Sequence, residues 1–233
     1  GEVISINLTP ELIYDVEALR ATIRAARPDV TIICSPNNPT GCVIGQTDLE
    51  SLLEETEGLI VIDEAYFEFS GQTVVPLLER HSNLVVLRTF SKAMALAGLR
   101  VGYLLAAPEL VREISKALLP YNLNVISQTA AEVAIEMYES KLQPLIAAIT
   151  SERDRLYREL QRIPGLAPVP SRANFMVVRS QIGPGLIFEG LLERGILIRD
   201  VSSYPLLSDY FRISVGTTEE NDLLLQALKE ICG

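Results

Sequence analysis

The sequence is poor in histidine and cysteine, and each scarcity argues against a class of site. The only histidine, His81, lies in a polar turn, which argues against a histidine-based catalytic triad and against a multi-histidine metal site. The three cysteines, Cys34, Cys42 and Cys232, are odd in number and lack the spacing of a zinc site. We therefore expect a reducing compartment and no bound metal.

Long hydrophobic runs and basic clusters are also missing. No apolar run approaches the ~18 residues that span a bilayer, and the first residues do not resemble a signal peptide. We expect a cytoplasmic protein without a membrane partner. The formal net charge is -10 and Lys and Arg form no cluster, so no nucleic-acid partner is expected. The 233 residues are 48% hydrophobic, enough for a large domain with a smaller appendage.

What the sequence does contain is a series of short apolar runs that each end in polar residues. They are Val30–Cys34, Leu59–Ile62 and Leu84–Leu87. Helical patterns at 15–26 and at 47–55, with Thr47 as a possible cap, separate them. This alternation predicts an α/β fold with a mainly parallel sheet sandwiched by helices. Ligands bind beyond the carboxyl ends of such strands, so we expect the polar residues to share one edge.

The rest of the chain divides into three parts. We expect a large domain over 1–124, a long connecting helix region over 125–159 and a small C-terminal α+β domain over 160–233. Alternation also predicts a strand at 3–6, and Pro144 is expected to break or kink the long helix. Further elements are predicted as strands at 101–106, 175–178, 196–198 and 211–215, and as helices from Pro108, at 185–194 and at 218–231.

One stretch combines a lysine with possible anion-binding groups. Lys92 follows a buried strand, and Thr89, Ser91 and Arg100 are near it in the sequence. This pattern fits an amine nucleophile beside an anion site. A surface lysine in a β-turn is the alternative that the stretch alone leaves open.

Four segments together resemble the ordered signature of fold-type-I pyridoxal-phosphate aminotransferases. They are Ser35–Gly41 (SPNNPTG), Asp63–Tyr66 (DEAY), Ser91–Lys92 (SK) and Gly98–Tyr103 (GLRVGY). The resemblance implies that the protein binds pyridoxal 5′-phosphate in a large domain of this family's fold. Such a cofactor acts as an electron sink and needs a carboxylate partner for its ring nitrogen.

The resemblance assigns a role to each residue of the expected cofactor site. Asp63 is expected to pair with the ring nitrogen, and Asn38 and Tyr66 to hold the phenolic oxygen. Lys92 is expected to form the Schiff base and then to move the proton as a free amine. Three residues are expected to bind the cofactor phosphate: Thr89, Ser91 and Arg100.

The C-terminal part resembles the histidinol-phosphate aminotransferase subfamily in Gly195–Asp200, Ser202–Leu206 and Phe211–Thr217. This resemblance implies that Arg199 and Arg212 bind the anionic groups of the substrates, since arginine presents a rigid donor fork. It implies a cytoplasmic homodimer that transfers an amino group between L-histidinol phosphate and 2-oxoglutarate in histidine biosynthesis. Asn174–Phe175 is open between a substrate-proximal strand start and a simple strand cap.

Other functions remain open at this point. Threonine-phosphate decarboxylase and other aminotransferases of the subgroup share the same cofactor residues. Winged-helix regulators with an aminotransferase-like domain need a basic DNA-binding segment, which this acidic chain lacks. The family also has an N-terminal segment with a glycine-containing loop that contacts the phosphate, and nothing before Val30 matches it. The large domain is thus expected to be N-terminally incomplete, and a catalytically inert fragment is a further alternative.

Overall fold

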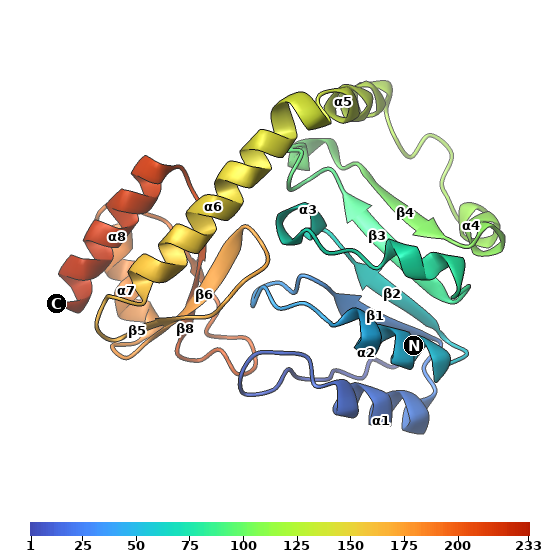
Figure 1. Ribbon diagram of the computed structural model, residues 1–233, viewed down its shortest axis with the longest axis horizontal. Helices are drawn as coiled ribbons and strands as arrows, with labels where there is room; N and C mark the ends of the chain where they lie inside the picture. Colours follow the sequence, from blue (N-terminus) through green and yellow to red (C-terminus); the bar gives the residue numbers. More distant parts are fainter.

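Two four-stranded sheets joined by a long helix make up the fold (Figure 1). The computed structural model describes residues 1–233. Sheet A has the order β1-β2-β3-β4, in which the first three strands are parallel and β4 is antiparallel. Its strands are β1 (Val30–Cys34), β2 (Leu59–Asp63), β3 (Leu84–Thr89) and β4 (Gly102–Ala106). The predicted α/β class with a mainly parallel sheet is confirmed.

Helices pack against one face of sheet A because their apolar residues recur on one side. In α1 (Val16–Ala26), Leu19 and Ile23 are buried, and the Asp15 side chain caps the helix by accepting from the Ala18 amide at 2.9 Å. The helix α2 (Gln46–Glu54) and the 3₁₀ turn η1 (Val75–Glu79) join the same thirteen-residue core. On the opposite face, Ile32 of β1 stays 71% exposed.

The connection between the two sheets is helical but interrupted. After α4 (Pro108–Ser115), the chain forms α5 (Val125–Glu136), a π-helical turn η3 (Tyr138–Leu142) and α6 (Gln143–Leu160). Pro144 lies in the first turn of α6, where a missing N–H costs no helical hydrogen bond. The predicted interruption is therefore present, just before the proline. None of these helices, or any other here, combines the length and apolar character needed to cross a bilayer.

Sheet B is antiparallel and is covered by three helices. Its order is β5-β6-β8-β7, formed by β5 (Leu166–Pro168), β6 (Phe175–Ser180), β8 (Tyr210–Ser214) and β7 (Arg199–Asp200). The helices α6, α7 (Pro184–Leu192) and α8 (Thr218–Cys232) enclose a core of fifteen buried residues with it. Two residues from the start of the chain, Leu8 and Leu12, also pack against Val177 of β6. A segment near the start of the chain thus reaches sheet B.

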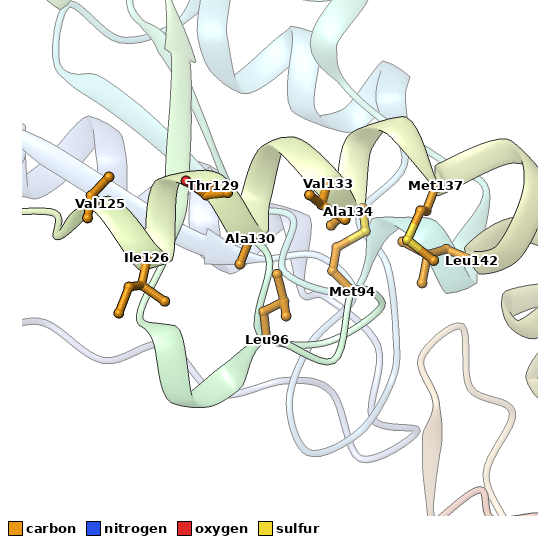
Figure 2. A pocket seen from close by; sticks show the side chains of 10 residues that line it. All are labelled: Met94, Leu96, Val125, Ile126, Thr129, Ala130, Val133, Ala134, Met137 and Leu142. Carbon is orange, nitrogen blue, oxygen red and sulfur yellow. The ribbon is translucent and has the colours of Figure 1, made fainter.

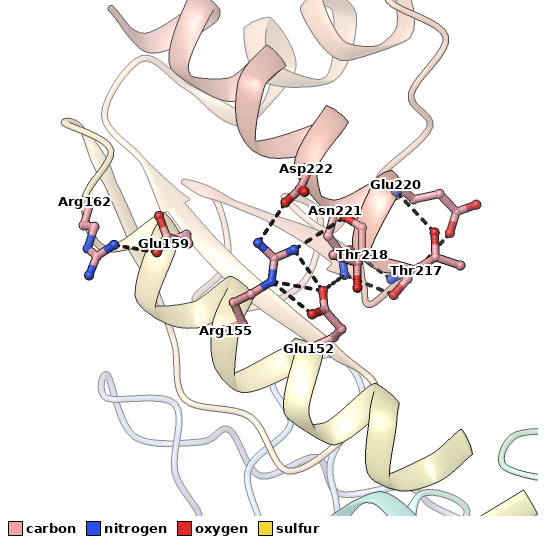
Figure 3. Close-up of polar contacts among 10 residues, drawn as sticks. Glu152, Arg155, Glu159, Arg162, Thr217, Thr218, Glu220, Asn221 and Asp222 are labelled. Carbon is pink, nitrogen blue, oxygen red and sulfur yellow. Dashed lines mark hydrogen bonds and ion pairs between the residues drawn. The ribbon is translucent and has the colours of Figure 1, made fainter. Parts of the chain in front are cut away.

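Polar side chains fasten α6 to α8 (Figure 3). Arg155 donates to Glu152 at 2.9 Å and to Asp222 at 2.8 Å, while the Asn221 amide donates to Glu152 at 3.0 Å. These hydrogen bonds hold the pKa of the Glu152 carboxyl below its usual range. The network orients the last helix across the connecting helix.

Three local predictions were wrong. Residues 3–6 form no strand, because alternation needs a neighbouring strand to pair with and sheet A offers none there. Residues 196–198 continue the helix-ending turn, since the Ile196 amide donates to the Leu191 carbonyl at 2.9 Å, and β7 begins only at Arg199. Thr47 lies inside α2, whose N-cap is Gly45.

Candidate active site

The carboxyl ends of β1, β2 and β3 lie side by side because these strands are parallel. Cys34 at the end of β1 is opposite Asp63 in β2, and Asp63 is opposite Leu87 in β3. The turn with Asn38 and the turn with Ser91 and Lys92 therefore leave the same edge of the sheet. Sequence reasoning placed these residues at one edge, and the strand register has that arrangement.

Asp63 is held by hydrogen-bond donors on both carboxylate oxygens. The Ala65 amide donates to Oδ1 at 2.9 Å, and the Cys34 thiol donates to Oδ2 at 3.6 Å. Burial, followed by the nearby Asp63 charge, raises the pKa of Cys34 to about 12, so the thiol stays protonated and able to donate. The carboxylate is thus fixed in orientation while it remains partly accessible.

Two hydroxyls and a guanidinium form a second cluster beyond β3. The Thr89 and Ser91 hydroxyls are 2.9 Å apart, and the Ser91 amide donates to Thr89 Oγ1 at 3.1 Å. The neighbouring turn is held beside them because the Phe90 amide donates to the Val101 carbonyl. Arg100 directly follows the 3₁₀ turn η2 (Ala97–Leu99), with a left-handed backbone (φ 54°), and has no acidic partner. Hydroxyls and an unpaired guanidinium suit a phosphate.

Lys92 lies next to an aromatic wall. Its side chain is exposed and forms no ion pair, and Nζ is 5.4 Å from the ring centroid of Tyr66. The buried Tyr66 ring meets Phe175 of sheet B edge-on at 5.0 Å between centroids. Tyr66 therefore lies next to both Lys92 and sheet B.

The two sheets also meet through a polar contact. Arg212 of β8 donates from Nη1 to the Asn38 side-chain oxygen at 2.8 Å, and its guanidinium lies 5.0 Å from the Phe175 ring centroid. Because Asn38 uses its carbonyl oxygen here, its amide N–H groups remain available to another acceptor. The Arg212 Nε is buried and has no hydrogen-bond partner within the chain.

Arg199 lies directly beside Arg212, since the two are opposed in the β7–β8 pair. Its side chain is exposed and donates no hydrogen bond within the chain, and neither arginine has a carboxylate partner. Two adjacent unpaired cations favour an anion over any neutral or cationic ligand.

Some residues of this edge were not expected from the sequence. The Tyr14 hydroxyl donates to the Cys34 carbonyl and accepts from the Asn37 amide group at 3.4 Å, which ties the start of the chain to the end of β1. Burial raises the pKa of Tyr14. Neither Tyr14 nor Cys34 belongs to a recognisable sequence pattern. Phe175 belongs to the Asn174–Phe175 pair, for which a position near the substrate was one of the two interpretations left open.

An open apolar groove borders the lysine turn (Figure 2). It has a volume of about 580 Å³ and is lined by nine hydrophobic residues and Thr129. Met94 and Leu96, which follow Lys92, face Val133 of α5 and Met137 just beyond that helix.

Comparison with known proteins agrees with this geometry. A sequence profile of aminotransferase class I and II matches residues 1–228. The chain belongs to this family of aminotransferases.

Among curated relatives, it is 41% identical over 229 residues to a histidinol-phosphate aminotransferase of Caldanaerobacter subterraneus subsp. tengcongensis, covering 98% of this chain and 64% of that protein. The chain therefore spans less than two thirds of this relative's length.

Solved structures are similar over nearly the entire chain. Histidinol-phosphate aminotransferase from Sinorhizobium meliloti, in complex with pyridoxal-5′-phosphate, has a TM-score of 0.87 at 28% identity, covering 100% of this chain and 64% of that one. L-threonine-O-3-phosphate decarboxylase from Porphyromonas gingivalis has a TM-score of 0.77 at 27% identity, covering 87% of this chain and 64% of that one.

Proposed function

We propose that this chain is the major part of a pyridoxal-phosphate-dependent aminotransferase that transfers an amino group between L-histidinol phosphate and 2-oxoglutarate in histidine biosynthesis. The observation that carries the proposal is the position of Lys92. This unpaired lysine faces Tyr66, whose ring contacts Phe175, and Phe175 in turn lies under Arg212. A series of contacts through two aromatic rings therefore connects an amine nucleophile with an arginine that can bind an anion.

The residues present fit pyridoxal 5′-phosphate. Asp63 offers an oriented carboxylate for the ring nitrogen, and Asn38 and Tyr66 offer donors for the phenolic oxygen. The phosphate fits the cluster of Thr89, Ser91 and Arg100. When bound, the cofactor supplies an electron sink for carbanionic chemistry at the substrate.

The chain's own residues supply attachment, proton transfer and orientation. Lys92 would hold the cofactor through its amine, and as a free amine it would hold and move the proton at the substrate carbon. The exposed lysine amine is free for both tasks because no carboxylate neutralises it within the chain. Asp63, held by the Ala65 amide and the Cys34 thiol, keeps the ring protonated.

The proposed substrate class rests on the two adjacent arginines, Arg199 and Arg212, and on the names of the relatives. Histidinol phosphate carries a phosphate, and 2-oxoglutarate carries two carboxylates, so the substrates of both half-reactions are anions. Arg212 and Arg199 can bind each in turn, since guanidinium forks match both carboxylate and phosphate. By the same resemblance, we propose that the protein acts as a cytoplasmic homodimer.

Threonine-phosphate decarboxylase is the second candidate, and the similarity to the Porphyromonas gingivalis structure favours it. Its substrate carries a carboxylate and a phosphate that the same two arginines would suit. The two functions differ in product, because decarboxylation releases carbon dioxide and needs no 2-oxo acid.

The experiment is a titration of the 233-residue chain with pyridoxal phosphate beside a Lys92→Ala variant. We expect a visible absorption band in the parent that borohydride removes, leaving the cofactor on Lys92 by peptide mass spectrometry. In a separate sample without borohydride, histidinol phosphate should change the band, and 2-oxoglutarate should restore it with formation of glutamate. Carbon dioxide from threonine phosphate would favour the second candidate. A folded parent without the band would mean that residues 1–233 alone do not hold the cofactor, and the same titration of a longer chain would test the parent protein.

A further inference from the structure

A buried ion pair joins the ends of the two strands that carry the candidate cofactor residues. Glu64, 1% exposed, follows β2 and accepts from Arg88 of β3 at 3.1 Å from Nε and 2.9 Å from Nη2. Its other oxygen accepts from the Val74 amide at 2.6 Å. The charge of Glu64 is therefore compensated on both oxygens, as a buried carboxylate requires.

The guanidinium of Arg88 is fixed on its other sides as well. It lies 3.5 Å from the centroid of the Phe67 ring, and Nη2 donates to Thr73 Oγ1 at 2.7 Å. The Thr73 hydroxyl in turn donates to Glu64 at 2.9 Å. Only a planar fork can make the double contact to Glu64 and stack on the ring at the same time, so a lysine cannot replace it.

The neighbours of this pair in the sequence are the candidate cofactor residues. Glu64 directly follows Asp63, and Arg88 directly precedes Thr89. The Glu64 amide donates to the Leu87 carbonyl at 2.9 Å, which extends the β2–β3 ladder to this point. Any movement of Glu64 against Arg88 therefore changes the distance between Asp63 and the turn with Lys92.

We infer that Glu64 and Arg88 are positioning residues that hold the ring-nitrogen partner and the lysine turn at a fixed separation. The inference rests on the proposed function, because it concerns the reaction of the same site. The pair acts through Asp63 and Thr89 and is not expected to touch the cofactor. A buried ion pair seldom stabilises a fold more than well-packed apolar residues do, so stability alone does not explain it.

Three variants separate positioning from stability. Glu64→Gln keeps the shape of the side chain, Arg88→Lys keeps the charge, and the double variant Glu64→Met/Arg88→Met removes both charges and restores apolar packing. Arg155→Lys serves as the matched control, since Arg155 also binds a glutamate, Glu152, but far from the site in the α6–α8 network.

The first readout is the titration with pyridoxal phosphate, followed by absorption. We expect roughly ten- to a hundredfold weaker binding and a shifted visible band in all three variants, since small misplacements of reacting groups have effects of this size. The double variant should recover the parent's melting temperature without recovering affinity. Arg155→Lys should keep the parent's affinity and band. Parent-like affinity and band in the three variants would overturn the inference.

The second readout needs no cofactor. Amide hydrogen exchange reports the Ala65 amide on Asp63 and the Ser91 amide on Thr89, one from each strand end. Both should lose protection in Glu64→Gln, while amides of β6 keep theirs. Unchanged protection at Ala65 and Ser91 would overturn the inference even if the parent binds no cofactor. Absence of the band in the parent would count against the proposed function of this chain alone, so the two failures are distinguishable.

Discussion

Sheets A and B each have four strands, but they differ in how far their side chains find partners within the chain. Sheet B encloses the larger core, in which β6 and β8 pack with α6, α7 and α8, and the Arg155–Asp222 ion pair fastens α6 to α8. Sheet A leaves Ile32 exposed on one face and ends in polar residues, several of them without partners inside the chain. Sheet B is dominated by apolar packing, whereas the edge of sheet A has polar side chains without hydrogen-bond partners in the chain.

The difference teaches that stability and function are separable in this chain. A side chain that binds a ligand must keep its polar atoms free, whereas a side chain that stabilises the fold is satisfied within it. Lys92 and Arg199 have polar atoms without a partner in the chain, as the first kind requires, whereas Leu156 and Arg155 are satisfied within the fold. Arg212 links the two, since it is rooted in sheet B and reaches Asn38.

Replacing Lys92 tests the sheet A side most severely. Lys92→Ala should abolish covalent attachment of pyridoxal phosphate and reduce transamination to background, because no other amine is placed to replace it. The melting temperature should stay within the range of ordinary surface substitutions, since the side chain is exposed. Borohydride trapping, mass spectrometry and calorimetry check this prediction. Trapping at another lysine in the variant would contradict it.

Truncating a core residue of sheet B should have the reverse effect. Leu156→Ala, at a fully buried position, should lower the free energy of unfolding by about 2–5 kcal/mol. Denaturant titration measures the loss, and cofactor affinity measured below the unfolding transition should stay at the parent's value. Leu223→Ala on the exposed side of α8 is the control, with an expected change within about 0.5 kcal/mol.

Arg212 should show both sides of the comparison. Arg212→Lys keeps the charge and loses the planar donor fork. The transition state should lose about 1.5–3 kcal/mol of stabilisation, and kcat/KM should fall by the corresponding factor. Arg179→Lys, an exposed arginine in the same sheet that pairs with Asp209 at 3.3 Å, is the control and should leave kcat/KM unchanged. Equal losses in the two variants would argue against a substrate role for Arg212.

Glu68, in the short helix α3 (Phe67–Ser70) that follows β2, should make the stability of the chain sensitive to pH. Burial raises the pKa of this carboxyl from 4.5 to about 7. The folded state therefore keeps a proton that the unfolded state loses, so stability falls as pH rises from about 4.5 to 7. Glu68→Gln should remove this slope and stabilise the chain above that window by about 1–2 kcal/mol. Unfolding measured across pH checks the result, with the exposed Glu54→Gln as control.

The smallest expected effect concerns the start of α8. Thr217 accepts from the Glu220 amide at 3.2 Å, while the Glu220 carboxylate accepts from the Thr217 amide at 2.8 Å. Thr217→Ala should cost about 1 kcal/mol of stability through loss of this capping box. Thr217→Ser should keep most of it, and kcat should be unaffected in both. A larger loss in the serine variant would show that packing of the methyl group matters more than the cap.

The sequence predicted what local chemistry determines. The three apolar runs formed parallel strands because continuous β-branched residues suit a covered sheet, and the motif segments followed their ends. Residues 3–6 also have a strand-like apolar pattern but no strand to pair with, so pattern alone failed there. Two contacts could not be predicted: the Cys34 thiol beside Asp63 and the Glu64–Arg88 ion pair. Both depend on the register between neighbouring strands that are far apart in the sequence, which no short pattern contains.

The hydrogen bond between Arg212 and Asn38 also has a consequence for biosynthesis of the protein. Its partners are 174 positions apart in the sequence. Leu8 and Leu12 likewise pack in a cluster with Val177 and Leu207, which are synthesised much later. During synthesis the lysine turn leaves the ribosome before β8 does, so Arg212 can reach Asn38 only after β8 has emerged.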